Sequence, residues 1–249
     1  MKLSEQEKAA KKAAFRAMPT AKKLEHIFIY YKWLILLGLI ALFIFGTTLR
    51  RTLTQKEPVL YLALVNVGVG SEMESSLNDG FLRYAGADGK RQEVYLYRDL
   101  YLSENADTLN HEYAYASRMK LMGSIQTQKL DIAIMNREGY DLCSQKGYLA
   151  DLPSLLADDP ALSEQVTPLL TENEVVLSDN SIDVMLKVAE EEVRVTQSVP
   201  NALSLSSLPL FQQAGFDSEI YLGILVNSQR TETALDYIRY LLSAGSAQT

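Results

Sequence analysis

The sequence predicts an α/β protein in which one N-terminal transmembrane helix is followed by a mostly parallel sheet flanked by helices. Two observations support this class. A long apolar run lies near the N-terminus, and after it short apolar stretches of strand length alternate with stretches of helical periodicity. Alternating strands and helices are joined by right-handed crossovers, which make successive strands parallel. With 47% hydrophobic and 22% charged residues, the composition suits a globular chain.

The apolar run contains no charged residue from Trp33 to Leu49, and Arg50 and Arg51 follow it directly. As a helix, residues 27–49 would be about 34 Å long, which is enough for a hydrocarbon core of about 30 Å. A buried core helix of this length would have a polar face, and a cleavable signal would end in small residues. We therefore expect residues 27–49 to cross a membrane once.

Charge is distributed unequally around this run. Residues 1–32 carry eight lysines or arginines and three acids, whereas residues 57–249 carry 13 basic and 28 acidic residues, a net charge of −15. Because basic residues favour the cytoplasmic side, we expect residues 1–26 to be a cytoplasmic basic tail, residues 50–58 a stalk, and residues 59–249 an extracellular domain at the cell membrane. An acidic domain argues against a nucleic-acid partner, while the apolar helix requires the lipid bilayer.

The inventory of reactive residues is small. Cys143 is the single cysteine, so the extracellular domain has no internal disulfide and we expect its core to hold the fold. His26 and His111 are the two histidines, and with one cysteine they do not make a metal-ligand cluster. The sequence also lacks a G-x-S-x-G elbow, a P-loop and an H-E-x-x-H motif. We therefore expect no enzyme, no metal and no cofactor.

Within residues 59–249, apolar runs predict strands and amphipathic stretches predict helices. The expected strands are residues 59–67, 93–97, 130–135 and 220–226. The expected helices are residues 72–84, capped by Ser71, and residues 111–129, 139–145, 162–170 and 231–243. The first strand is apolar at nearly every position, which is typical of a central strand covered on both faces.

Residues 157–209 form a small subregion with a less regular pattern. Residues 182–188 and 192–196 are expected to pair as a hairpin across the acidic pair between them. Residues 198–207 are expected to form a loop.

Three stretches carry a resemblance to a known fold: VLYLALVNV with the helix after it, LDIAIMNREGYDLCSQKGYLADLPSLL (130–156) and YLGILVNSQRTETALDYIRYLLS (221–243). They resemble the opening strand, the third strand with its helix, and the late strand and helix that return to the first lobe of extracellular (type 2 periplasmic) solute-binding proteins. The stretch KLEHIFIYYKW before a single span is also similar to membrane-anchored proteins of anaerobic Gram-positive bacteria.

The resemblance implies a membrane-anchored, reduced relative of that fold, which would bind a small solute or peptide for a transporter or sensor. It covers roughly a third of the chain. Residues 157–209 would have to supply the second lobe, and one βαβ unit takes about 30 residues or more. We therefore expect a lobe-like domain whose second lobe is small or degenerate.

In an open parallel sheet, ligands bind outside the carboxyl ends of the strands. The residues that follow the three expected strands are Asn66, Gly68, Gly70, Arg98, Asp99, Asn136 and Arg137. Loop amides, a helix N-terminus and polar side chains can together hold a small polar or anionic group. The same residue types are also typical of turns, caps and solvated charges.

A second group of candidates consists of tyrosines. They are Tyr95, Tyr97, Tyr101, Tyr113 and Tyr115. Such a set could line a groove for a sugar or peptide, or it could be half-buried packing on strand and helix faces.

Two functions therefore remain open. The domain could be a binding module that captures a small solute or peptide, or a non-catalytic interaction protein that docks a partner of a membrane complex. A pocket with convergent polar groups at Asn66, Arg98 and Asn136 would favour the first function, and a filled cleft would favour the second.

Overall fold

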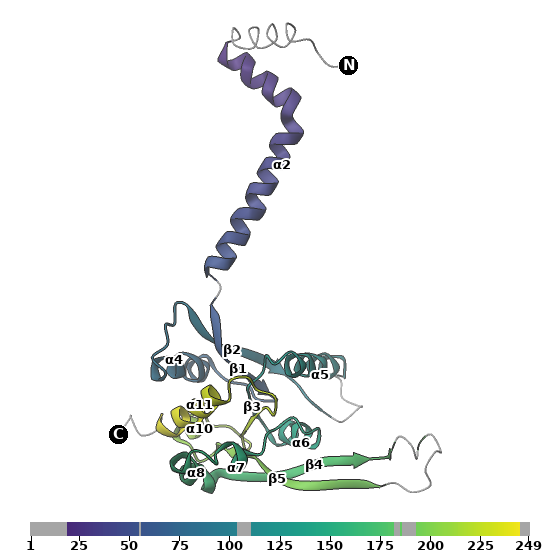
Figure 1. Ribbon diagram of the computed structural model, residues 1–249, viewed down its shortest axis with the longest axis vertical. Helices are drawn as coiled ribbons and strands as arrows, with labels where there is room; N and C mark the ends of the chain where they lie inside the picture. Colours follow the sequence, from purple (N-terminus) through teal and green to yellow (C-terminus); the bar gives the residue numbers. More distant parts are fainter. Residues whose placement is uncertain (1–18, 55, 104–110, 182–184, 186–192, 245–249) are drawn as a thin grey trace. The chain divides into compact units, whose positions relative to one another are not determined.

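The computed structural model describes residues 19–54, 56–103, 111–181, 185 and 193–244, which fall into two compact units divided between Gln55 and Lys56 (Figure 1). The first unit is the helix α2 (Thr20–Thr54). Within it, Lys32–Arg50 is long and apolar enough to cross a membrane, and no part of it is buried against protein. Most of the expected basic tail lies outside the described residues.

The second unit contains a six-stranded mixed sheet. Its strands are β1 (Glu57–Val65), β2 (Gln92–Leu100), β3 (Ile132–Met135), β4 (Leu170–Asp179), β5 (Arg194–Ser204) and β6 (Tyr221–Ile224), in the order β2-β1-β3-β6-β5-β4. β1 is parallel to β2 and β3, whereas the β3–β6, β6–β5 and β5–β4 pairs are antiparallel. The expectation of a mostly parallel sheet is therefore wrong beyond the first three strands, because the later strands join as a hairpin and a returning strand rather than through helical crossovers.

Helices cover both faces of this sheet. They are α3 (Ser71–Ser75), the π-helix η1 (Ser76–Gly80), α4 (Phe81–Tyr84), α5 (His111–Gln126), α6 (Arg137–Gln145), α7 (Leu152–Leu155), α8 (Pro160–Val166), the 3-10 turn η2 (Thr167–Leu169), α10 (Pro209–Ala214) and α11 (Thr231–Ser243). Leu62 and Leu64 of β1 pack against α3 to α4 and α11, and Ala63 and Val65 pack against α5 and α6. The prediction that β1 is a central strand covered on both faces is confirmed.

The expected helix over residues 72–84 is divided by the π-helix η1. Hydroxyl groups from α11 explain this division, since Tyr237 donates to the carbonyl of Leu77 (3.1 Å) and Tyr240 donates to the carbonyl of Ser76 (2.6 Å). Glycine at position 80 leaves room for this contact, because a Cβ atom would lie 2.1 Å from the Tyr240 hydroxyl and would displace it. The expected cap is wrong by one residue: Gly70 occupies the N-cap position and provides no side-chain acceptor.

Residues 157–209 differ most from expectation. Part of the expected hairpin lies outside the described residues, and the observed hairpin β4–β5 begins at Leu170. Residues 198–204 are strand rather than loop, because Leu203 pairs with Leu222 of β6 and is buried. The expected helix over 162–170 is found as α8 and η2, and the Asp159 side chain accepts the N–H of Leu162 (3.1 Å).

Candidate functional site

The carboxyl ends of β1 and β3 lie next to each other, as predicted, and the N–H of Asn136 donates to the carbonyl of Val65 (3.3 Å). The Asn66 side chain contacts the chain itself. Its Nδ2 donates to the carbonyl of Leu102, and its Oδ1 accepts the N–H of the same residue, both at 2.7 Å. Asn66 therefore holds the loop after β2 against the end of β1, in a left-handed backbone conformation (φ 57°).

Asn136 and Arg137 also make contacts within the domain. The Asn136 side chain caps α6 by accepting the N–H of Gly139 (2.9 Å). Arg137 forms an ion pair with Asp141 (2.9 Å), and its guanidinium lies 5.7 Å from the ring centre of Tyr140. Both side chains thus support the position of α6.

The other predicted ligand residues have more open surroundings. At Gly68 and Gly70, a Cβ atom would meet no other heavy atom within 4 Å. Asp99 has a left-handed backbone (φ 58°), and its carbonyl accepts the Tyr113 hydroxyl. Arg98 forms an ion pair with Glu74 of α3.

Arg98 lines a hollow of about 420 Å³ along the outer edge of β2. The other lining residues are Lys56, Asn78, Asp79, Leu82, Glu93, Val94, Tyr95 and Leu96. Apart from Lys56, which directly precedes β1, they come from β2 and from η1 and α4, so the hollow is a groove between a strand edge and a helix. The Asn78 Oδ1 atom is buried and has no hydrogen-bond partner among the described residues.

Gly70 lines a different hollow, of about 350 Å³, between α3, α10 and the end of α11. The predicted residues are therefore divided between two hollows and a set of contacts within the fold. Their assignment as a single ligand site stays a prediction.

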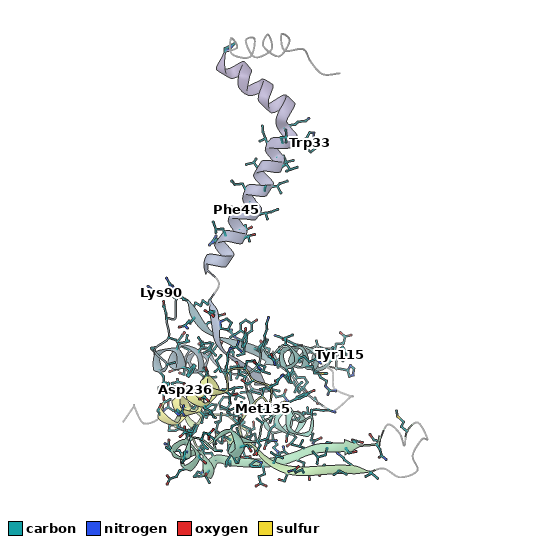
Figure 2. The ribbon with its side chains drawn as sticks, in the orientation of Figure 1. Trp33, Phe45, Lys90, Tyr115, Met135 and Asp236 are labelled. Atoms are coloured by element: carbon teal, nitrogen blue, oxygen red, sulfur yellow. The ribbon has the colours of Figure 1, made fainter. Side chains whose placement is uncertain are left out.

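The tyrosines form two groups. The rings of Tyr61, Tyr95 and Tyr97 contact one another, with Tyr61 and Tyr95 centres 5.6 Å apart and Tyr95 and Tyr97 centres 4.9 Å apart. Tyr101 and Tyr113 stack separately at 6.4 Å. Figure 2 shows Tyr115 at the surface of the domain, in contrast to the enclosed Met135.

A buried carboxylate, which no sequence pattern had indicated, lies beside the first group of tyrosines. Asp131 is fully buried; it accepts the N–H of Tyr61 (2.9 Å) and the hydroxyl of Ser228 (2.7 Å). Arg230 lies 3.5 Å from the same carboxylate and 4.7 Å from the Tyr61 ring centre. Burial raises the pKa of Tyr97, and the negative charge of Asp131 adds to this effect. Asp131 and Arg230 lie far apart in the sequence and belong to no common motif, so their ion pair could not be predicted from the sequence.

A second buried polar network fixes the root of the β4–β5 hairpin to α6. The Tyr140 hydroxyl lies 2.9 Å from Asn201 Oδ1, Asn201 Nδ2 donates to the Ser144 hydroxyl (2.8 Å), and Ser144 donates to the carbonyl of Glu174 (3.0 Å). Tyr140, Ser144 and Asn201 are all fully buried. Because each group is hydrogen-bonded, the network specifies one position for the hairpin.

The distal half of that hairpin is much less covered. Figure 1 shows both strands continuing beyond α6. The exposed fractions are 60% for Leu177, 52% for Val193 and 45% for Val195. Among the described residues, these apolar side chains are therefore exposed on the part of the hairpin that lies beyond α6.

The described part of the chain contains neither a metal-ligand group nor a reactive thiol. No group of three His, Cys, Asp or Glu residues there is placed to hold a metal ion. Cys143 is 1% exposed, and burial raises the pKa of its thiol to about 12, so the reactive thiolate is disfavoured.

No family model matches this chain, and no curated protein and no solved structure matches it either. The class of the protein is therefore defined by its fold: an α/β domain with a mixed sheet, preceded by a helix long and apolar enough to span a membrane.

Proposed function

We propose that this protein is a single-pass membrane protein whose extracellular domain docks a partner of a membrane complex without catalysing a reaction. The observation that carries the proposal is the distal half of the β4–β5 hairpin, where Leu177 and Val195 are exposed together with Val193, which directly precedes β5. Isolated two-stranded hairpins are marginally stable in water, and grouped apolar side chains on the surface are typical of interaction sites. A partner that covers this half would bury the apolar side chains and stabilise the strands.

The membrane part of the proposal depends on α2 and its flanking charges. Lys32–Arg50 has the length and composition of a membrane-spanning helix, and basic residues are concentrated before it. The acidic domain after it would then lie outside the cell. Protease added to intact cells should degrade the domain; a domain that survives until the cells are opened would contradict this orientation.

Docking is favoured over ligand trapping by the contacts of the predicted ligand residues. Asn66, Asn136 and Arg137 bind the domain's own backbone or side chains. The chain segment that would supply a second lobe instead extends the same sheet as β4 and β5.

Capture of a small solute is the second candidate function. It is favoured by the hollow of about 420 Å³ beside Arg98, which includes the polar residues Lys56 and Glu93.

The two candidates can be separated with the full chain. A photo-crosslinking residue introduced at Leu177 or Val195 in intact cells should give one adduct of defined mass, while the same residue at the exposed Lys90 turn should not. The absence of an adduct at both hairpin positions would contradict docking through the hairpin. In lipid nanodiscs, a sugar or amino acid that raises the melting temperature, with the rise lost in Arg98→Ala, would instead support solute capture.

A further inference from the structure

We propose that the groove along the outer edge of β2 binds an extended peptide segment of a partner protein, which adds to the sheet as a further strand. The occupant would be recognised mainly through its main chain, by hydrogen bonds to β2. The inference concerns the opposite edge of the sheet from the β4–β5 hairpin and does not depend on the docking function proposed for that hairpin.

The first support is the free edge itself. β2 is the terminal strand of the sheet and pairs with β1 on one side. The carbonyl of Arg91 accepts the N–H of Glu57 on that side, and backbone groups alternate along a strand, so the N–H and C=O groups of Val94 and Leu96 point outward. Among the described residues, no other element hydrogen-bonds to the backbone of residues 93–98.

The second support is the shape of the hollow. Its lining includes consecutive residues of β2 together with Asn78 and Leu82 of the adjacent helices, so it follows the strand edge. A peptide in this position would pair its backbone with β2 and contact the side chains of η1 and α4, and main-chain pairing with pockets for alternate side chains is how peptides add to sheet edges. Val94 and Leu82 are each 5% exposed and form an apolar floor for alternate side chains of the peptide.

The third support is the unpartnered amide of Asn78. Its buried Oδ1 has no donor within the described domain, and a buried polar atom without a partner is unfavourable. A peptide N–H supplies the missing donor, whereas an apolar occupant does not.

The charges of the groove define the peptide further. Lys56 and Glu93 lie near the beginning of the paired strands, whereas Arg98 lies near the end of β2. Asp79 also lines the groove, so two cations and two anions are present and the groove has no net charge. This balance favours a peptide of small net charge over a polyanion such as nucleic acid.

The test uses the full chain in lipid nanodiscs and a synthetic pool of capped seven-residue peptides that alternate Val, Ile or Thr with Ser. We expect binding by fluorescence anisotropy for some members. Methylating the alternate backbone nitrogens of a binder that face β2 should weaken its binding at least tenfold, whereas methylating the other set should change it less than about threefold. Equal effects of the two sets, or no binding at about 1 mM by any member, would overturn the proposal.

A protein variant provides an independent readout. Asn78→Leu removes the unpartnered oxygen, so we expect at least fivefold weaker peptide binding with a melting temperature equal to or above that of the natural chain. Unchanged binding in Asn78→Leu would contradict the role of this amide. Leu177→Asp, at the other edge of the sheet, is the matched control. It should leave peptide binding unchanged but abolish the adduct formed by a photo-crosslinking residue at Val195. The two variants therefore test the peptide groove and the docking hairpin separately, and one proposal can be overturned without the other.

Discussion

The middle of the sheet is enclosed by the rest of the domain, whereas its β4–β5 end is largely exposed, although the strands are hydrogen-bonded to their neighbours in both regions. Every residue of β3 and β6 is buried, whereas no residue of β4 is fully buried. β5 shows both conditions within one strand, since Asn201, Ala202 and Leu203 are buried and the residues near Arg194 are exposed. Because the strands are paired in both regions, their burial depends on the helices that cover the sheet, and we expect stability to follow burial. Four changes to the chain test this difference, from the largest expected effect to the smallest.

The largest effect is expected from truncating a side chain in the middle of the sheet. Leu62→Ala should lower the free energy of unfolding by about 2–5 kcal/mol, because Leu62 is fully buried and its loss leaves a cavity. The matched change Leu177→Ala, in the exposed half of the hairpin, should alter it by about 0.5 kcal/mol or less. Urea unfolding followed by near-ultraviolet circular dichroism can measure both. Equal losses would mean that the hairpin is part of the cooperative core.

Gly80→Ala tests the close approach between η1 and α11. Its Cβ would lie 2.1 Å from the Tyr240 hydroxyl, so that side chain must shift away from the Ser76 carbonyl that it binds, and we expect a loss of about 1–3 kcal/mol. Gly123→Ala in α5 is the control, because nothing lies within 4 Å of that Cβ. Alanine favours helix over glycine, so this variant should be more stable by about 0.5–1 kcal/mol. A loss in both variants would rule out the specific clash.

Asn201→Ala tests whether the buried network holds the hairpin at its root. The substitution leaves the Ser144 and Tyr140 hydroxyls without a side-chain partner, and we expect a loss of about 1–3 kcal/mol. Amide hydrogen exchange should accelerate first in β4 and β5, with β1 and β3 protected longest. If exchange accelerated equally in all four strands, the hairpin and the middle of the sheet would form a single cooperative unit.

The smallest effect concerns a surface contact that joins α8 to α11. The pKa of Asp159 lies below its ordinary value of 3.8, because its carboxylate accepts the N–H of Leu162 and pairs with Arg239. A lowered pKa gives stability that is fully present above the ordinary value and is lost as the pH falls through the lowered one. Asp159→Asn should therefore be less stable than the natural chain at neutral pH, and the difference should shrink as the pH falls below 3.8. A constant difference in urea midpoint would contradict the charge effect.

The sequence predicted the elements that are defined by their own residues. Residues 33–49 carry no charge, β1 is covered on both faces, and α11 begins and ends at the expected residues. The role of the candidate ligand residues could not be predicted. A polar residue after a strand can hydrogen-bond either to a ligand or to a neighbouring loop of its own chain, and the sequence pattern is the same in both cases. Asn66 and Asn136 lie at adjacent strand ends as predicted, yet both contact their own chain.

By itself, the sequence determined the long apolar helix, the acidic α/β domain after it and the central position of β1, because hydrophobic periodicity is a local property of the chain. The tertiary structure alone decided the antiparallel half of the sheet, the π-helix held by Tyr237 and Tyr240, and the buried network around Asn201. These features depend on groups that lie apart in the sequence, by 57 residues for Ser144 and Asn201 and by 160 for Leu77 and Tyr237. Their pairing is fixed by burial, which removes water as the alternative hydrogen-bond partner.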